Sequence, residues 1–187
     1  MRFLGLWLVL SAALLLSCGQ PGSPASPETS SPASSTRLES PPATAGWNSY
    51  HNQKWGYAIN YPPSWYDLGD LGAPDTERYF ANRKDIRSPM GIGADGILFS
   101  LSMLSGGCRG APPGDIDGSA RLMVDGQFVT RVTGLLGPPR SEAFWSSYSS
   151  VPKGTNCYAF VFTFGGKATR DASLQITDQM VGSFTTS

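Results

Sequence analysis

Apolar and polar residues alternate in short segments through much of the chain after residue 46, and this period of two predicts β-strands. Residues 47–51 and 57–61 flank a polar turn, and two prolines end the second segment, so this region predicts a first hairpin. Farther on, residues 97–103 alternate as well. One side of that expected strand carries Ile97, Phe99, Leu101 and Met103.

Two more hairpins are expected in the second half of the chain. Asp125-Gly126 separates residues 121–124 from 127–132, and this dipeptide tolerates the positive φ angles of a type I′ turn. Residues 144–150 and 157–164 flank another short loop. The segment 157–164 is apolar or small on both faces, which is typical of a strand in the middle of a sheet that is covered on each side.

A helical pattern closes the chain. Asp171 is expected to cap a helix whose apolar residues recur every three or four positions. These residues are Leu174, Thr177, Met180, Val181 and Phe184. Strands followed by a helix predict an α+β fold with a largely antiparallel sheet.

The first 17 residues have the pattern of a signal peptide. Arg2 precedes an apolar stretch of 14 residues, from Phe3 to Leu16, which is shorter than the roughly 20 residues that span a bilayer. Leu15-Leu16-Ser17-Cys18 resembles the lipobox of bacterial lipoproteins, in which the cysteine becomes the acylated first residue. We therefore expect acyl chains such as palmitate on Cys18, and an extracytoplasmic protein anchored in a membrane of the cell envelope. An ordinary secretory leader is the alternative.

Residues 18–46 differ sharply in composition from the rest of the chain. From residue 19 to 46, Pro, Ser, Thr and Ala occupy 20 of the 28 positions, and Leu38 is the one large apolar residue. Such a segment cannot bury enough apolar surface to offset the entropy of ordering it. We expect a disordered tether, followed by a single domain over residues 47–187.

The segment Gly56-Tyr57-Ala58-Ile59-Asn60-Tyr61-Pro62-Pro63-Ser64-Trp65 resembles the opening strand and turn of PsbP-like domains. Residues 182–185 are similar to the closing segment of that family, and the hairpin at Asp125-Gly126 also fits. The family comprises α/β/α sandwiches in extrinsic photosystem proteins, a Ran-binding relative and many bacterial lipoproteins. The resemblance implies that fold, and it implies binding of proteins or ions without catalysis. The manganese, chloride and photosystem contacts of the plant proteins have no match in this chain.

The net charge and the composition argue against several other classes of function. The 14 basic and 14 acidic residues cancel, which disfavours nucleic-acid binding. The chain has one histidine, so a metal site with two or three histidines is impossible and any catalytic imidazole must belong to His51. We expect neither a cofactor nor a metal.

Cys108 and Cys157 remain once Cys18 is assigned to lipid. In an exported protein such a pair is most simply a disulfide, which would exclude a nucleophilic thiol. Two free thiols, or one thiol acting as a redox sensor, are the alternatives.

For three sequence motifs we favour a structural interpretation over a functional one. The GxGxxG of residues 91–96 is preceded by Ser88-Pro89 and followed by an expected strand, so a loop is favoured over a dinucleotide site. Residues 115–118 hint at a calcium loop, but Gly126 stands where the bidentate glutamate belongs, and a surface turn is favoured. Ser150 and Lys153 match SxxK, but that chemistry needs a helix, and Pro152 favours a hairpin.

Seven aromatic residues crowd into positions 47–66, and two interpretations stay open. The preferred one is that the rings pack under the sheet. The other is that some rings line a groove for a peptide or sugar. The candidates for such a groove are Trp55, Tyr61, Pro63 and Trp65.

These observations predict a non-catalytic binding or scaffolding module for an envelope component, and we expect that component to be a protein whose identity the sequence does not give. The main alternative is an envelope hydrolase that uses His51 or Ser150. A small-ligand or ion-binding protein is the third class.

Overall fold

The computed structural model describes residues 44–137 and 142–187. The predicted signal peptide, the lipidation site Cys18 and nearly all of the predicted tether lie outside these residues. In the described part, no helix is long and apolar enough to cross a membrane.

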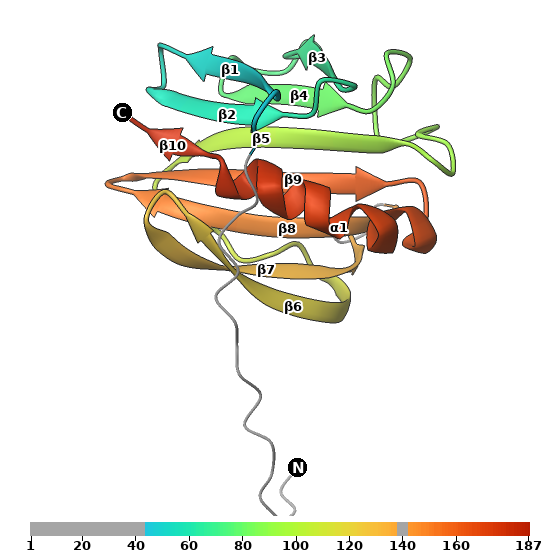
Figure 1. Ribbon diagram of the computed structural model, residues 1–187. Helices are drawn as coiled ribbons and strands as arrows, with labels where there is room; N and C mark the ends of the chain where they lie inside the picture. Colours follow the sequence, from blue (N-terminus) through green and yellow to red (C-terminus); the bar gives the residue numbers. More distant parts are fainter. Residues whose placement is uncertain (1–43, 138–141) are drawn as a thin grey trace, which may run out of the picture. The chain divides into compact units, whose positions relative to one another are not determined.

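Ten strands and one helix make up this part of the chain (Figure 1). The strands are β1 (Asn48–Asn52), β2 (Tyr57–Tyr61), β3 (Tyr66–Gly69), β4 (Glu77–Ala81), β5 (Ile97–Ser105), β6 (Gly114–Val124), β7 (Gln127–Leu136), β8 (Phe144–Lys153), β9 (Asn156–Phe164) and β10 (Thr185–Thr186). The helix is α1 (Lys167–Gly182).

The strands form two antiparallel sheets. The larger has seven strands in the order β3-β4-β5-β9-β8-β7-β6, and the smaller has the order β1-β2-β10. The predicted hairpins are all present, and β9 is the middle strand of the large sheet, as its two apolar faces predict. The α+β class with a largely antiparallel sheet is confirmed. Between β6 and β7, Asp125 and Gly126 have φ values of 47° and 75°, as a type I′ turn requires.

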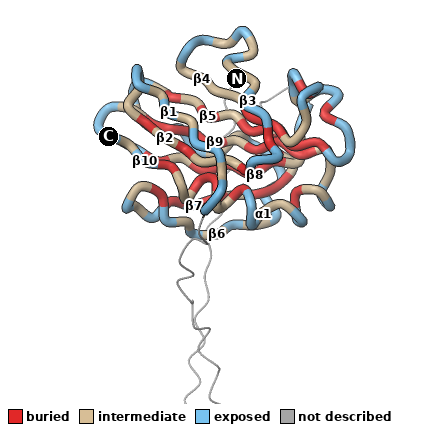
Figure 2. Tube along the Cα trace, turned by 45° about the horizontal axis from the view of Figure 1, so that its top comes forward, coloured by how far each residue is buried: buried red, intermediate tan, exposed pale blue. Residues whose placement is uncertain are grey.

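One face of the large sheet carries the main core. The even-numbered residues of β9 and the odd-numbered residues of β5 pack there, and Phe99 stacks on Phe162 with ring centroids 4.3 Å apart. Helix α1 and strand β2 cover this face, which we call the helix-covered face. Figure 2 shows that buried residues concentrate along the central strands. Apolar side chains from three layers meet here, so the largest buried apolar cluster of the described residues lies on this side.

Helix α1 begins earlier than the sequence predicts. Its N-cap is Gly166, so Asp171 lies within the helix, and the predicted cap is wrong. The Thr169 hydroxyl donates to the Ala94 carbonyl at 2.6 Å, which fixes the first turn against a distant loop. Asp171 instead accepts from Lys167 and Arg170. A tertiary contact therefore sets the start of the helix, where local capping preference predicted another residue.

The opposite face of the large sheet, the helix-free face, has no helix among the described residues. The outer layer that a full α/β/α sandwich would place there consists of two connections instead. Residues 82–96, the glycine loop, cover Ala81 and Leu98 with Ile86 and Ile92. Residues 106–113, the crossover loop, run from the end of β5 to the start of β6 at the far edge of the sheet.

Candidate binding groove

Between these two loops, the helix-free face contains an open groove of about 530 Å³. Its floor is formed by β7, β8 and β9, and its walls by the glycine loop, the crossover loop and the segment before β8. The lining residues are Pro89, Met90, Pro112, Leu136, Gly137, Glu142, Phe144, Ser146, Tyr148, Val161 and Thr163. Most of the surface that they present is apolar, and Glu142 is the one charged residue among them.

A second hollow of about 360 Å³ adjoins the groove at the ends of β8 and β9. The two share Pro89, Met90, Glu142 and Phe144, and the second also reaches Trp145 and Phe164. Met90 stands between them with 72% of its surface exposed, the largest value among the large apolar residues of the described part. An apolar, concave site with an exposed flexible thioether is suited to a hydrophobic ligand.

The glycine loop is held against the sheet by close backbone contacts. A Cβ atom added to Gly165 would lie 1.6 Å from the Gly93 carbonyl oxygen, so only glycine permits this approach. The Gly165 amide also donates to the Gly96 carbonyl at 2.9 Å. The GxGxxG motif is thus a structural loop, as expected, and it places Met90 at the groove.

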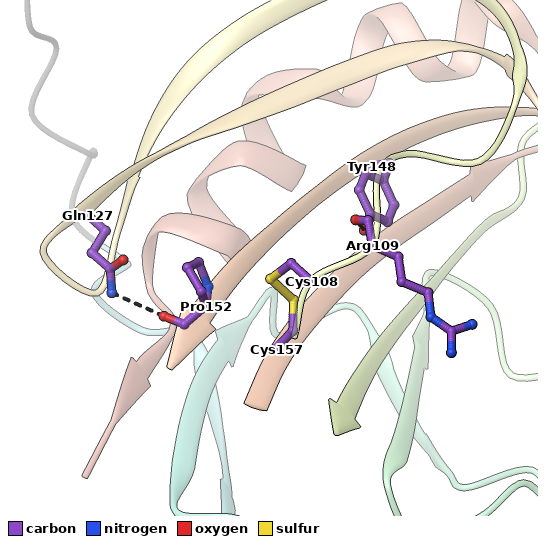
Figure 3. The surroundings of a disulfide bond; sticks show 6 residues. All are labelled: Cys108, Arg109, Gln127, Tyr148, Pro152 and Cys157. Carbon is purple, nitrogen blue, oxygen red and sulfur yellow. Dashed lines mark hydrogen bonds between the residues drawn. A yellow bond between two sulfur atoms is a disulfide. The ribbon is translucent and has the colours of Figure 1, made fainter. Parts of the chain in front are cut away.

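The crossover loop is fixed by covalent and polar contacts (Figure 3). The predicted disulfide between Cys108 and Cys157 is present and attaches the loop to β9. The Tyr148 hydroxyl donates to the Arg109 carbonyl at 2.8 Å, and the Gly137 amide donates to the Pro113 carbonyl at 3.0 Å. Pro112, between these anchors, therefore forms a fixed wall of the groove.

Polar groups on the floor of the groove are few. The Ser146 hydroxyl donates to the Phe144 carbonyl at 2.9 Å, and Tyr148 is engaged by the crossover loop. Thr163 is buried on the floor, and its hydroxyl forms no hydrogen bond with the described residues. Specific polar recognition in the groove would depend on Thr163 and on Glu142 at the rim.

Several ionisable groups with shifted pKa values lie on the helix-covered side. Burial raises the pKa of Tyr57 to about 12. Burial also raises the pKa of Asp178, although Arg131 donates to both of its carboxylate oxygens. The hydrogen bond from Arg170 holds the pKa of Asp117 below its usual value. Each of these groups lies in the core or is paired with a cation, and burial or pairing accounts for its shift.

The aromatic residues proposed for a groove lie elsewhere. Trp65 is 6% exposed and packs edge-on against Phe162, so it belongs to the core and cannot line an open groove, which corrects that prediction. Tyr61 packs on Phe80 with ring centroids 4.9 Å apart. Trp55 is half-buried and donates its indole N–H to the Asp75 carbonyl, while Pro63 is exposed. Packing under the sheet, the preferred interpretation, describes most of these rings.

The residues of the enzymatic alternative belong to different sheets. His51 is exposed on β1 of the small sheet, 3.0 Å from the Ser49 hydroxyl. Ser150 lies on β8 of the large sheet. Lys153, also on β8, forms an ion pair with Asp125. The SxxK pair is therefore on a strand, and no cluster of three or more candidate metal ligands occurs in the described part.

The prediction of a surface turn at residues 115–118 is wrong. They are part of strand β6 and not a surface turn. Asp117 accepts a 2.7 Å hydrogen bond from Arg170, which is buried in α1 and packs over the Trp145 ring. Residues 114–116 and 118 pair with residues 133–136 of β7 around a bulge at Asp117, so a long-range pairing that local sequence cannot reveal places this segment in the strand.

Sequence reasoning missed the groove itself. Its walls come from two connections that return over the sheet, and its floor comes from three strands. The available signal was the pair of proline-containing loops, Ser88-Pro89-Met90 and Pro112-Pro113, beside strands with apolar residues on both faces.

Comparisons with known proteins return similar folds and no family. No family model matches the chain, and no curated protein matches it. Cyanobacterial PsbP (CyanoP) from Synechocystis sp. PCC 6803 is 14% identical over 78% of this chain and 95% of its own, with a TM-score of 0.47. The Ran-binding protein Mog1p of Saccharomyces cerevisiae is 10% identical over 75% and 95%, with a TM-score of 0.48. A protein of Bacteroides thetaiotaomicron VPI-5482 is 11% identical over 75% of this chain and 48% of its own, with a TM-score of 0.47.

Proposed function

We propose that this chain is a membrane-anchored, extracytoplasmic lipoprotein whose PsbP-like domain is a non-catalytic binding module for another component of the cell envelope. The groove on the helix-free face is the proposed binding site, and an apolar segment of a partner protein is the proposed occupant. The observation that carries this proposal is the groove's lining, which is apolar, concave and held open by a disulfide-anchored wall.

The chemistry of the lining favours an apolar occupant. Met90, Phe144 and Val161 offer polarisable and aliphatic contacts, and burying them against a ligand would gain roughly 25 cal/mol per Å² of apolar surface. One carboxylate at the rim, that of Glu142, would disfavour an anionic ligand. Few polar groups on the floor are available to stabilise a charged intermediate.

The proposed location rests on the sequence. The leader has the length and polarity of an export signal, and Cys18 follows a lipobox-like segment. The Cys108–Cys157 disulfide is compatible with an oxidising compartment.

Binding of a neutral fluorescent probe tests the groove. N-phenyl-1-naphthylamine should bind the full chain at one saturable site. Met90→Asp places a charge at that site and should weaken binding about tenfold or more. Because Met90 is highly exposed, this substitution should leave the free energy of unfolding within about 0.5 kcal/mol.

Ile176→Asp is the matched control, because Ile176 is also an exposed apolar residue but lies on α1, away from the groove. It should leave probe affinity unchanged. Equal loss of binding in both variants, or none in Met90→Asp, would reject the groove as the site.

The anchor is tested separately with Cys18→Ser. Metabolic labelling with palmitate should mark the wild-type chain and not the variant, and the variant should leave the membrane fraction on washing. Retention of processed Cys18→Ser protein in washed membranes would refute the lipid anchor, without bearing on the groove.

A further inference from the structure

Strand β6 is a long edge strand with one open side. It has 11 residues, and among the described residues it pairs with β7 alone. An edge strand of this length presents a row of backbone groups to which another extended chain can pair. It lies beside the groove but shares none of its lining residues.

The register identifies the open backbone groups. Val124 and Gln127 flank the two-residue turn and are therefore a hydrogen-bonded pair. Hydrogen-bonded and non-hydrogen-bonded pairs alternate along an antiparallel ladder. The N–H and C=O groups of Ser119, Arg121 and Met123 consequently face away from β7.

Exposed apolar side chains lie on the same hairpin as these unpaired backbone groups. Three of the large apolar residues exposed in the described part lie on the β6–β7 hairpin: Ile116 is 57% exposed, Met123 42% and Phe128 50%. Met123 and Phe128 are directly cross-strand, and the register places Ile116 on the same helix-free face. Such a cluster of exposed apolar residues is typical of an interaction surface.

Arg121 gives this surface its charge preference. Its guanidinium lies over the Phe128 ring, 4.4 Å from the centroid, between Ser119 and Met123 on the same face. A second copy of β6, paired antiparallel about Ala120 or Arg121, would bring two Arg121 side chains close together. Like charges on neighbouring strand positions are destabilising, so self-pairing is disfavoured and an acidic partner strand is favoured.

We propose that β6 is a second docking surface, which adds an extended segment of a partner protein as an eighth, antiparallel strand. The segment carries a carboxylate opposite Arg121 and an apolar residue opposite Met123. Backbone hydrogen bonds to residues 119–123 supply affinity, and the alternate side chains supply specificity. This surface is independent of the groove.

The test uses the full chain in detergent micelles and the capped peptide Thr-Val-Thr-Glu-Thr-Val-Thr. Amide signals of residues 119–123 should shift in ¹H–¹⁵N spectra and gain protection from hydrogen exchange. The same peptide with Lys in place of Glu should bind about five- to tenfold more weakly. Arg121→Glu should reverse this preference, and because Arg121 is exposed the variant should fold.

Ser119→Pro removes one open N–H without removing a ladder bond, since edge strands accept proline on their free side. It should weaken binding of the Glu peptide, whereas the matched control Ser119→Val should not. Equal binding of the two peptides, an unaltered affinity in Ser119→Pro, shifts outside β6, or a dimer formed through β6 would each overturn the proposal.

Discussion

The two faces of the large sheet are built from the same strands but covered in different ways. On the helix-covered face, aromatic side chains of β5 and β9 meet α1 and the small sheet in one continuous core. On the helix-free face, two loops cover smaller, separate clusters of apolar residues and leave a groove between them.

The helix-covered face is therefore expected to contribute mainly to stability, and the helix-free face to offer the space for binding. Continuous packing by a helix leaves no room for a ligand, because protein interiors are close-packed. Loops that cross a sheet cover it incompletely, and the concave space that remains is where binding sites commonly occur. On the helix-free face the disulfide attaches the crossover loop, which packs against only a small apolar cluster.

Neighbouring residues of β9 give the sharpest contrast between the faces. Phe162 is 1% exposed on the helix-covered face, and Phe162→Ala should lower the free energy of unfolding by about 3–5 kcal/mol through loss of packing and a cavity. Val161→Ala, on the groove floor, should cost only about 1 kcal/mol. Urea unfolding monitored by circular dichroism measures both. Similar losses would show that the two faces contribute equally.

Removal of the disulfide tests the wall of the groove. Cys108 and Cys157 are 49 residues apart, so the entropy model gives a loss of about 4 kcal/mol for Cys108→Ala with Cys157→Ala. Hydrogen exchange should increase in residues 106–113 and change little in α1. Exchange that increases equally in both segments would mean that the crossover loop is not an independent element.

Acid sensitivity should depend on the ion pair between β6 and α1. The Arg170 hydrogen bond lowers the pKa of Asp117 in the folded chain, so this carboxylate stabilises the fold above its unfolded pKa of about 4. That contribution is lost as the pH falls through the folded pKa. Because Asp117 is exposed and solvent screens its ion pair, Asp117→Asn should cost at most about 1 kcal/mol at pH 7, and its difference from wild type should shrink toward pH 2.

Thermal unfolding between pH 7 and pH 2 measures this dependence. A difference between Asp117→Asn and wild type that stays constant with pH would contradict the assignment. A matched control is Asp70→Asn, since Asp70 is exposed and its carboxylate accepts only from the Gly72 amide among the described residues.

The smallest effect is expected at His51. Its side chain is exposed on β1, so His51→Ala should change the free energy of unfolding by less than about 0.5 kcal/mol and leave probe binding intact. A serine-hydrolase probe should label neither protein. Labelling that His51→Ala abolishes would favour the enzymatic alternative over a binding module.

The parts predicted from the sequence depend on local patterns. Alternation along residues 97–103 and the Asp125-Gly126 turn act within a few residues, and the two apolar faces of residues 157–164 suffice to place β9 centrally. The errors involve distant partners. Helix α1 begins at Lys167, where Thr169 bonds Ala94, so Asp171 is not its cap. Residues 115–118 belong to β6 because they pair with β7 around a bulge at Asp117.

The groove could not be predicted for the same physical reason. Its walls come together only when residues 82–96 and 106–113 fold back over a sheet whose strand order is itself non-sequential. Aromatic residues between positions 47 and 66 were candidates for a binding groove because composition alone does not distinguish a buried ring from an exposed one.

Site-specific photocrosslinking in intact cells tests the central claim most directly. A benzophenone amino acid is placed at position 90 in the groove, or at position 176 on α1, in the full chain with Cys18 intact. The account predicts a discrete adduct with an envelope component from position 90, which Val161→Asp in the groove floor abolishes, and none from position 176. Adducts from position 176 alone, or equal adducts from both positions, would contradict it.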